Sequence, residues 1–214
     1  MINIDEVVSS IRESITLVDA YLREKDEVRE LIIKSGRDVI RESGYVITSL
    51  HSMRLEDAGK HYSAMKDIYL KVTELASKYP ELRNSGLYFN IASEYVEAAL
   101  YYILIKEGRL PSISDLGVDP VPYVQGLLDL VGELKRRILD LVRDDKYDEA
   151  YTLFKVAEAI YESVRTLDYP DPILPGVRRK TDVARSVTES LRTLLTDLES
   201  RRRLMESLRK CESS

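Results

Sequence analysis

Residues Leu87–Ile105 read LYFNIASEYVEAALYYILI, the most apolar stretch of this 214-residue chain. At about 100° per residue, its apolar side chains cover nearly the whole circumference of a helix, which predicts burial on most sides. The polar side chains fall on one narrow stripe that has no basic residue: Asn90, Ser93, Glu94 and Glu97. Buried carboxylates without a local cation must be protonated, find distant partners or hold a metal ion. Taken alone, the glutamate pair fits salt bridging and a functional role equally well.

Outward from this stretch, apolar residues recur at three- and four-residue steps along most of the chain. This periodicity predicts an all-α bundle of six to seven antiparallel helices with a very long first helix, in one domain over residues 1–214. Any bend in the first helix is expected near Gly36 or Gly44, and Asp119 is the expected N-cap of the fourth. The six expected helices span residues 4–52, 55–78, 82–106, 121–143, 147–167 and 177–209.

The bulk composition narrows the classes of function. A net charge of −5 argues against a uniformly basic nucleic-acid surface, although a local basic patch is compatible with it. The single cysteine, Cys211, excludes intramolecular disulfides and predicts a reducing, cytoplasmic location. Residues 1–12 alternate charged and apolar side chains, unlike a signal peptide. We expect no membrane span, because Leu87–Ile105 carries two glutamates and an asparagine.

A second carboxylate pair lies on the expected helix 121–143. Asp129 and Glu133 are four residues apart and therefore share a helix face. That face lies opposite the apolar stripe, and the simplest interpretation is a solvated surface. The alternative is that it meets Glu94 and Glu97, so that four carboxylates bind one or two Mg²⁺ ions through hard oxygen ligands.

Three segments resemble the translin family, and specifically its translin-associated factor X branch. They are SEYVEAALYYILI at 93–105, YVQGLLDLVGELKRR at 123–137 and LPGVRRKTDVARSV at 174–187. Their order and spacing are similar to those of the family, and the resemblance covers nearly the whole chain. It implies a translin-like helical fold, with an archaeal source expected.

The resemblance also implies an activity. In the catalytic branch, the acids that match Glu94, Glu97, Asp129 and Glu133 bind Mg²⁺ and cut single-stranded RNA; Mn²⁺ is an alternative ion. An endoribonuclease of this kind is a subunit of a closed oligomer, typically an octamer, either of one chain or with a related subunit. Its acidic sites are expected to face an interior cavity.

Two other functions stay open. One is a scaffold of the same family that binds single-stranded RNA or DNA without cutting it. The four acids weigh against the scaffold, because carboxylates repel phosphate unless a metal ion is bound. The other is a di-metal bundle for redox chemistry, disfavoured because neither His51 nor His61 follows a glutamate in a Glu-x-x-His pattern.

The candidates for RNA contact are basic side chains in or beside three of the expected helices. The family carries a basic pair in its first helix, but Gly44 and Tyr45 occupy the matching place here. Each candidate, taken singly, is more simply a solvated helix charge. The five candidates are Arg37, Arg41, Arg54, Lys60 and Arg136.

Overall fold

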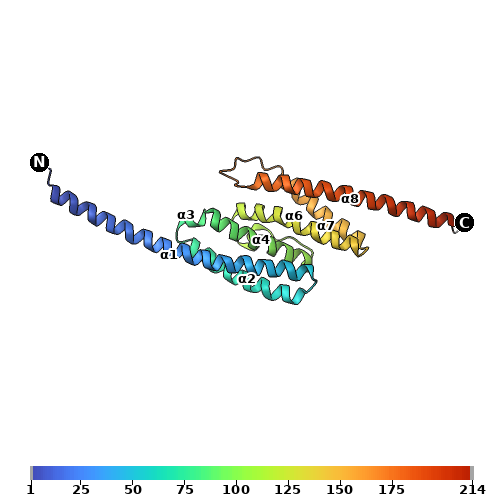
Figure 1. Ribbon diagram of the computed structural model, residues 1–214, viewed down its shortest axis with the longest axis horizontal. Helices are drawn as coiled ribbons and strands as arrows, with labels where there is room; N and C mark the ends of the chain where they lie inside the picture. Colours follow the sequence, from blue (N-terminus) through green and yellow to red (C-terminus); the bar gives the residue numbers. More distant parts are fainter. Residues whose placement is uncertain (1, 213–214) are drawn as a thin grey trace.

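The computed structural model describes residues 2–212, which form eight α-helices and no strand (Figure 1). The all-α prediction with a very long first helix is confirmed. Six helices are long, and two, α3 and α5, have four residues each. The helices are α1 (Ile4–His51), α2 (Leu55–Ala76), α3 (Pro80–Arg83), α4 (Gly86–Glu107), α5 (Ile113–Leu116), α6 (Pro120–Arg143), α7 (Tyr147–Val164) and α8 (Val177–Glu212).

The third predicted helix is divided in the structure. Pro80 begins the one-turn helix α3, and α4 starts only at Gly86. The new start has a local cause, because the Ser85 hydroxyl accepts a hydrogen bond from the backbone N–H of Tyr88 at 3.2 Å. At its other end α4 stops at Gly108, whose φ of 69° lies in the left-handed region that glycine adopts without strain.

The predicted cap of α6 is only half right. Asp119 occupies the N-cap position, but its side chain makes no cap hydrogen bond. Its carboxylate instead accepts hydrogen bonds from Arg83, at 2.9 Å from Nε and 3.1 Å from Nη2. A bidentate pair with a guanidinium is stronger than one cap bond, so Asp119 ties α3 to the start of α6.

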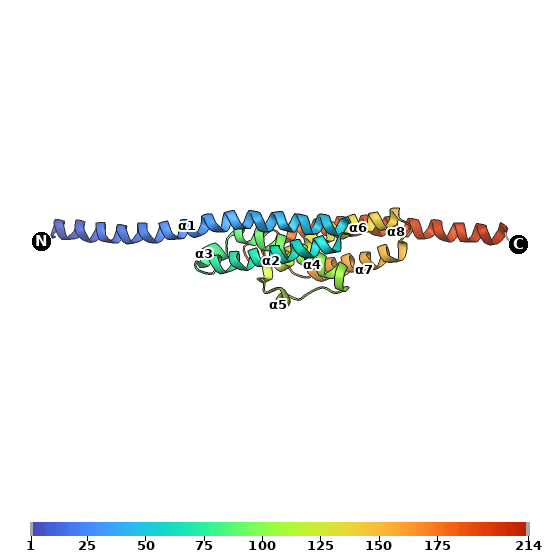
Figure 2. The ribbon, with the colours of Figure 1, turned by 90° about the horizontal axis from the view of Figure 1, so that it is seen from below.

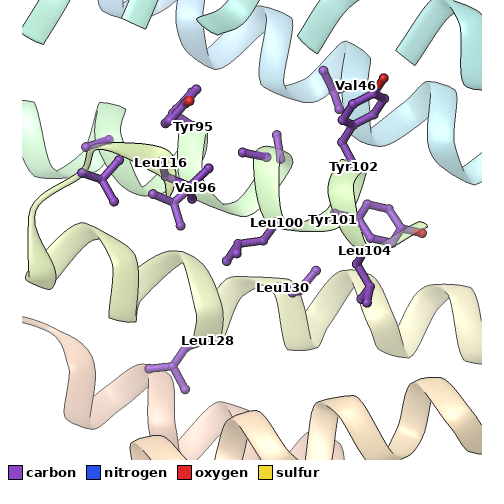
Figure 3. Close-up of a cluster of buried hydrophobic side chains, with 14 of the residues drawn as sticks. Val46, Tyr95, Val96, Leu100, Tyr101, Tyr102, Leu104, Leu116, Leu128 and Leu130 are labelled. Carbon is purple, nitrogen blue, oxygen red and sulfur yellow. The ribbon is translucent and has the colours of Figure 1, made fainter. Parts of the chain in front are cut away.

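Helix α4 lies at the centre of the bundle. It contacts α1 and α2 on one side and α6 on the other, and α7 and α8 pack against α6. Figure 3 shows Tyr95 and Tyr102 directed toward the α1 side and Leu100 directed toward α6. Tyr95 also stacks on Tyr69 of α2, with ring centroids 4.0 Å apart. Burial on several sides explains why α4 has so few polar residues.

Two glycines let the neighbouring helices approach α4 closely. A Cβ at Gly36 of α1 would lie 2.2 Å from Cδ1 of Ile91. A Cβ at Gly126 of α6 would lie 2.6 Å from Cγ1 of Val96 and 3.0 Å from the backbone nitrogen of Glu97. Helix α1 runs uninterrupted through Gly36, which serves packing. Gly126 sets the backbone of α6 directly against the position of Glu97.

The two longest helices extend beyond the bundle. The first turns of α1 project from one end and the last turns of α8 from the other (Figures 1 and 2). Every residue of α1 from Ile4 to Glu24 is exposed. Residues 199–211 of α8 are exposed as well. No helix within residues 2–212 combines the length and apolarity that crossing a bilayer requires.

Candidate active site

Three of the four predicted carboxylates line one pocket. Glu94 and Glu97 reach it from α4, and Asp129 reaches it from α6. Asp129 therefore does not lie on a freely solvated helix face. The first turns of α8 form the remaining wall. The other lining residues are Leu128, Gly132, Gly176, Arg179, Lys180 and Val183.

The carboxylates in this pocket repel one another. Burial raises the pKa of Glu97 to about 8, and the negative charges of Asp129, Glu94 and Glu133 add to the rise. Burial also raises the pKa of Glu94, with Asp129 as the second cause. Lys180 opposes the rise at both glutamates. The pocket therefore favours a bound cation, because a positive charge is what would let all the acids ionise together.

Lys180 supplies such a charge from within the chain. Its Nζ donates a hydrogen bond to Oδ2 of Asp129. Both side chains are partly exposed, at 34% and 27%. Lys180 also lines an adjoining pocket with Asn90 and Gln125. The lysine thus lines both the carboxylate pocket and this second pocket.

The loop before α8 fixes the position of the first turn of α8, from which the Lys180 side chain extends. Gln125 of α6 donates a hydrogen bond from Nε2 to the carbonyl oxygen of Pro175 at 2.7 Å. The next residue, Gly176, has a φ of 70° and donates its N–H to the Asp171 carboxylate at 2.9 Å. These contacts hold the start of α8 against α6. Lys180, four residues after Gly176, therefore faces Asp129.

Glu133 has a different partner. Its Oε2 lies 2.6 Å from Nε2 of His51, the last residue of α1. On the other side of the imidazole, the hydroxyl of Tyr101 lies 3.4 Å from Nδ1. The His51 side chain is only 5% exposed, so its ring is held firmly between Tyr101 and Glu133. Glu133 still lies near enough to the pocket to raise the pKa of Glu97.

The donor set fits a hard divalent cation by its chemistry. All four acids offer oxygen, the ligand type that Mg²⁺ and Mn²⁺ accept. Within the described residues, however, no three acidic, histidine or cysteine side chains converge closely enough to form a ready-made metal site. Asp129 is held by Lys180 and Glu133 by His51. Glu94, Glu97 and Asp129 are therefore the residues that would hold such an ion, provided that Lys180 moves away from Asp129.

The predicted RNA-contacting side chains lie elsewhere on the surface. All five are exposed, and none lines the carboxylate pocket. Arg41 pairs with Asp38 at 2.8 Å, and Lys60 pairs with Glu56 at 3.0 Å, each within its own helix. Arg54 lies 3.6 Å from Asp57. The cations that do line the pocket are Arg179 and Lys180.

Sequence reasoning missed Lys180 and His51. Lys180 lies inside the segment LPGVRRKTDVARSV, so its place near the start of the last helix was visible. Its contact with Asp129 spans fifty-one positions, and that of His51 with Glu133 spans eighty-two. Helical periodicity carries no information about pairs so far apart.

The fold and the pocket together define a class: an all-α bundle that gathers carboxylates from two central helices at a site walled by its last helix. The family model described as the translin family matches residues 27–201, and the chain belongs to that family. The curated relative "Uncharacterized protein MJ0175" of Methanocaldococcus jannaschii is 31% identical over 172 residues. That match covers 79% of this chain and 75% of the relative.

Solved structures have the same fold. A crystal structure of AfC3PO is similar with a TM-score of 0.81 and 27% identity, and covers 88% of this chain and 98% of its own. AfC3PO in complex with duplex RNA gives a TM-score of 0.81 at 26% identity, with the same coverage. Apo-NeC3PO is similar in fold, with a TM-score of 0.76 at 24% identity over 85% of this chain and 95% of its own.

Proposed function

We propose that this protein is a divalent-cation-dependent endoribonuclease that cleaves single-stranded RNA, of the translin-associated factor X branch of the translin family. The observation that carries the proposal is the shared pocket of Glu94, Glu97 and Asp129, with Glu133 near enough to perturb Glu97. Such a cluster repels an RNA phosphate unless a cation accompanies it. Mg²⁺ is the proposed ion, and Mn²⁺ is an alternative.

The chain's own groups have distinct roles in this proposal. Glu94, Glu97 and Asp129 would hold the ion, which when bound polarises a phosphate and makes water more acidic. Glu133, oriented by its 2.6 Å contact with His51, would accept the proton of the attacking water. Lys180, once released from Asp129, would stabilise negative charge on the scissile phosphate.

The alternative function is a scaffold that binds single-stranded RNA or DNA without cutting it. The complex of AfC3PO with duplex RNA supports RNA binding by a relative of this fold, and is compatible with either function. The acidic pocket favours cleavage, because a pure binding surface gains nothing from several carboxylates that repel phosphate.

The proposed assembly is a closed oligomer, an octamer in the expected form, made of this chain alone or with a related subunit. Its acidic pockets would open onto an enclosed interior, which restricts access to flexible single strands. Size-exclusion chromatography with light scattering tests the assembly, and a strictly monomeric protein would contradict it.

The activity is tested with labelled single-stranded RNA and duplex RNA, each with Mg²⁺ and with EDTA. The protein should cut the single strand only with Mg²⁺, and Glu97→Gln should abolish the cut. Glu107→Gln is the matched control, because Glu107 lies exposed at the end of the same helix α4. Cleavage that survives both Glu97→Gln and EDTA would rule out the proposed site. Binding without cleavage by the unmutated protein would establish the scaffold instead.

A further inference from the structure

The first turns of α1 carry an apolar seam that the rest of the described chain does not cover. We call residues 4–24 of α1 the N-terminal arm; all of them are exposed. At about 1.5 Å per residue, the arm is roughly 30 Å long. The arm ends where Tyr21 packs edge-on against Tyr79 and Lys25 forms a 3.0 Å ion pair with Glu81.

The seam has the spacing of a coiled coil. Its six apolar residues alternate at steps of four and three, so that they fill the two core positions of three successive heptads. Each side chain is between 38% and 64% exposed. An isolated helix of this length is marginal in water, and a continuous apolar stripe makes a partner helix favourable. The seam residues are Ile4, Val8, Ile11, Ile15, Val18 and Leu22.

The arm lies outside the segment that the translin family model matches. The translin family model begins at residue 27, after the arm has ended. The seam therefore calls for an explanation of its own, independent of the proposed nuclease activity.

The charge of the arm argues against two classes of partner. Residues 2–26 hold six acidic and three basic side chains, a net charge of −3. This charge disfavours nucleic acid and anionic lipid as partners, since both attract basic helices. The exposed end of α8 is basic, but its apolar residues are only Leu204, Met205 and Leu208, too few to match six seam positions.

We infer that the N-terminal arm forms a coiled coil with the arm of a second copy of this chain. Two identical arms bring six apolar layers into register, whether they run parallel or antiparallel. Isologous pairing of one surface with itself is the commonest way in which soluble proteins associate. The arm thus links two protomers at a distance from the carboxylate pocket.

The test uses two substitutions of equal charge on the same helix. Ile15→Glu places a carboxylate in the seam, while Leu17→Glu places one beside it, at a side chain that is 73% exposed. Amide hydrogen exchange over residues 4–20 should be at least about tenfold faster in Ile15→Glu than in the unmutated protein. Leu17→Glu should keep the slow exchange. Both variants should fold, because neither side chain is buried.

A crosslink identifies the partner. Cys211 is the only cysteine, so Ser14→Cys combined with Cys211→Ser leaves one thiol, next to the seam. A short bis-maleimide reagent should then join two chains, and adding Ile15→Glu should prevent the link. The inference is overturned if no covalent dimer forms, if the unmutated protein is monomeric, or if both glutamate variants exchange alike. Binding of the arm to lipid vesicles in place of self-association would also overturn it.

Discussion

Lys180 of α8 donates a hydrogen bond to the carboxylate of Asp129 on α6, so the candidate site contains its own cation. The same lysine acts on Glu94 and Glu97, whose pKa values it pulls downward against the effect of burial. In the proposed function, this tethered ammonium would compete with a divalent ion for the same negative charge. The metal affinity of the site would then reflect the difference between the two interactions.

Lys180→Met should tighten binding of a divalent ion. Removing the ammonium frees Asp129 and leaves the pocket more negative, so we expect Mn²⁺ affinity to rise by about tenfold. Titration calorimetry or the electron paramagnetic resonance signal of Mn²⁺ measures it without RNA. Arg179→Met is the control, because Arg179 lines the same pocket but has no ion pair with Asp129. Weaker Mn²⁺ binding by Lys180→Met would contradict the competition.

The metal-free protein should lose stability as the pH rises through the titration of Glu97. Its pKa rises from an ordinary 4.5 to about 8 on folding, so the folded chain holds this proton more tightly than the unfolded chain. The free energy of unfolding should therefore fall between these two pH values and level off above the higher one. Glu94, whose pKa is also raised, adds to the same trend.

Urea unfolding in EDTA, at a series of pH values from about 5 to 9, measures this dependence. Glu97→Gln should reduce the decrease in the free energy of unfolding with pH. Near pH 9, this variant should be more stable than the unmutated protein by the order of a few kcal/mol. Glu107→Gln should leave the slope of the free energy of unfolding against pH unchanged. An identical slope in Glu97→Gln would show that Glu97 titrates normally.

The pair of Glu133 with the buried His51 should contribute more to stability than the pair of Glu42 with the half-exposed His61. His51→Phe leaves the Glu133 carboxylate without its partner, at a loss of about 1–3 kcal/mol. His61→Phe is the matched comparison: His61 lies 2.7 Å from Glu42, but its side chain is 36% exposed, and we expect a loss below about 1 kcal/mol.

A double-mutant cycle shows whether His51 acts through Glu133. In a Glu133→Gln background, the effect of His51→Phe should shrink by at least half, because the two side chains are in contact. Chemical denaturation of the four proteins gives their free energies of unfolding, from which the coupling between the two side chains is calculated. Fully additive losses would indicate that His51 matters only as a core side chain.

Two glycines of α6 should respond to alanine in opposite directions. Gly126→Ala forces a Cβ against Val96 and the backbone of Glu97, and we expect a loss of about 1–3 kcal/mol. Gly132→Ala meets no atom within 4 Å and removes a poor helix former, so it should add about 0.5–1 kcal/mol. Thermal and urea denaturation measure both. A neutral Gly126→Ala would mean that α4 and α6 can separate without loss.

Much of the fold could be predicted because helix formation depends on near neighbours. The three- and four-residue steps of α1 indicate a helix, and the nearly continuous apolar surface of α4 also indicates its burial. The errors lie at helix ends. A serine hydroxyl caps the new start of α4 after α3, and the side chain of Asp119 turns to Arg83 instead of capping α6. Such choices depend on which partner is nearest in space.

The sequence by itself determined that Glu94 and Glu97 share one face of a buried helix, and that Asp129 and Glu133 share a face of another. Both facts follow from spacing along one helix, where 3.6 residues make a turn. Only the tertiary structure decided that Asp129 meets Lys180 and that Glu133 meets His51. These partners come from other helices, and packing around Gly126 and the loop before α8 brings them within reach.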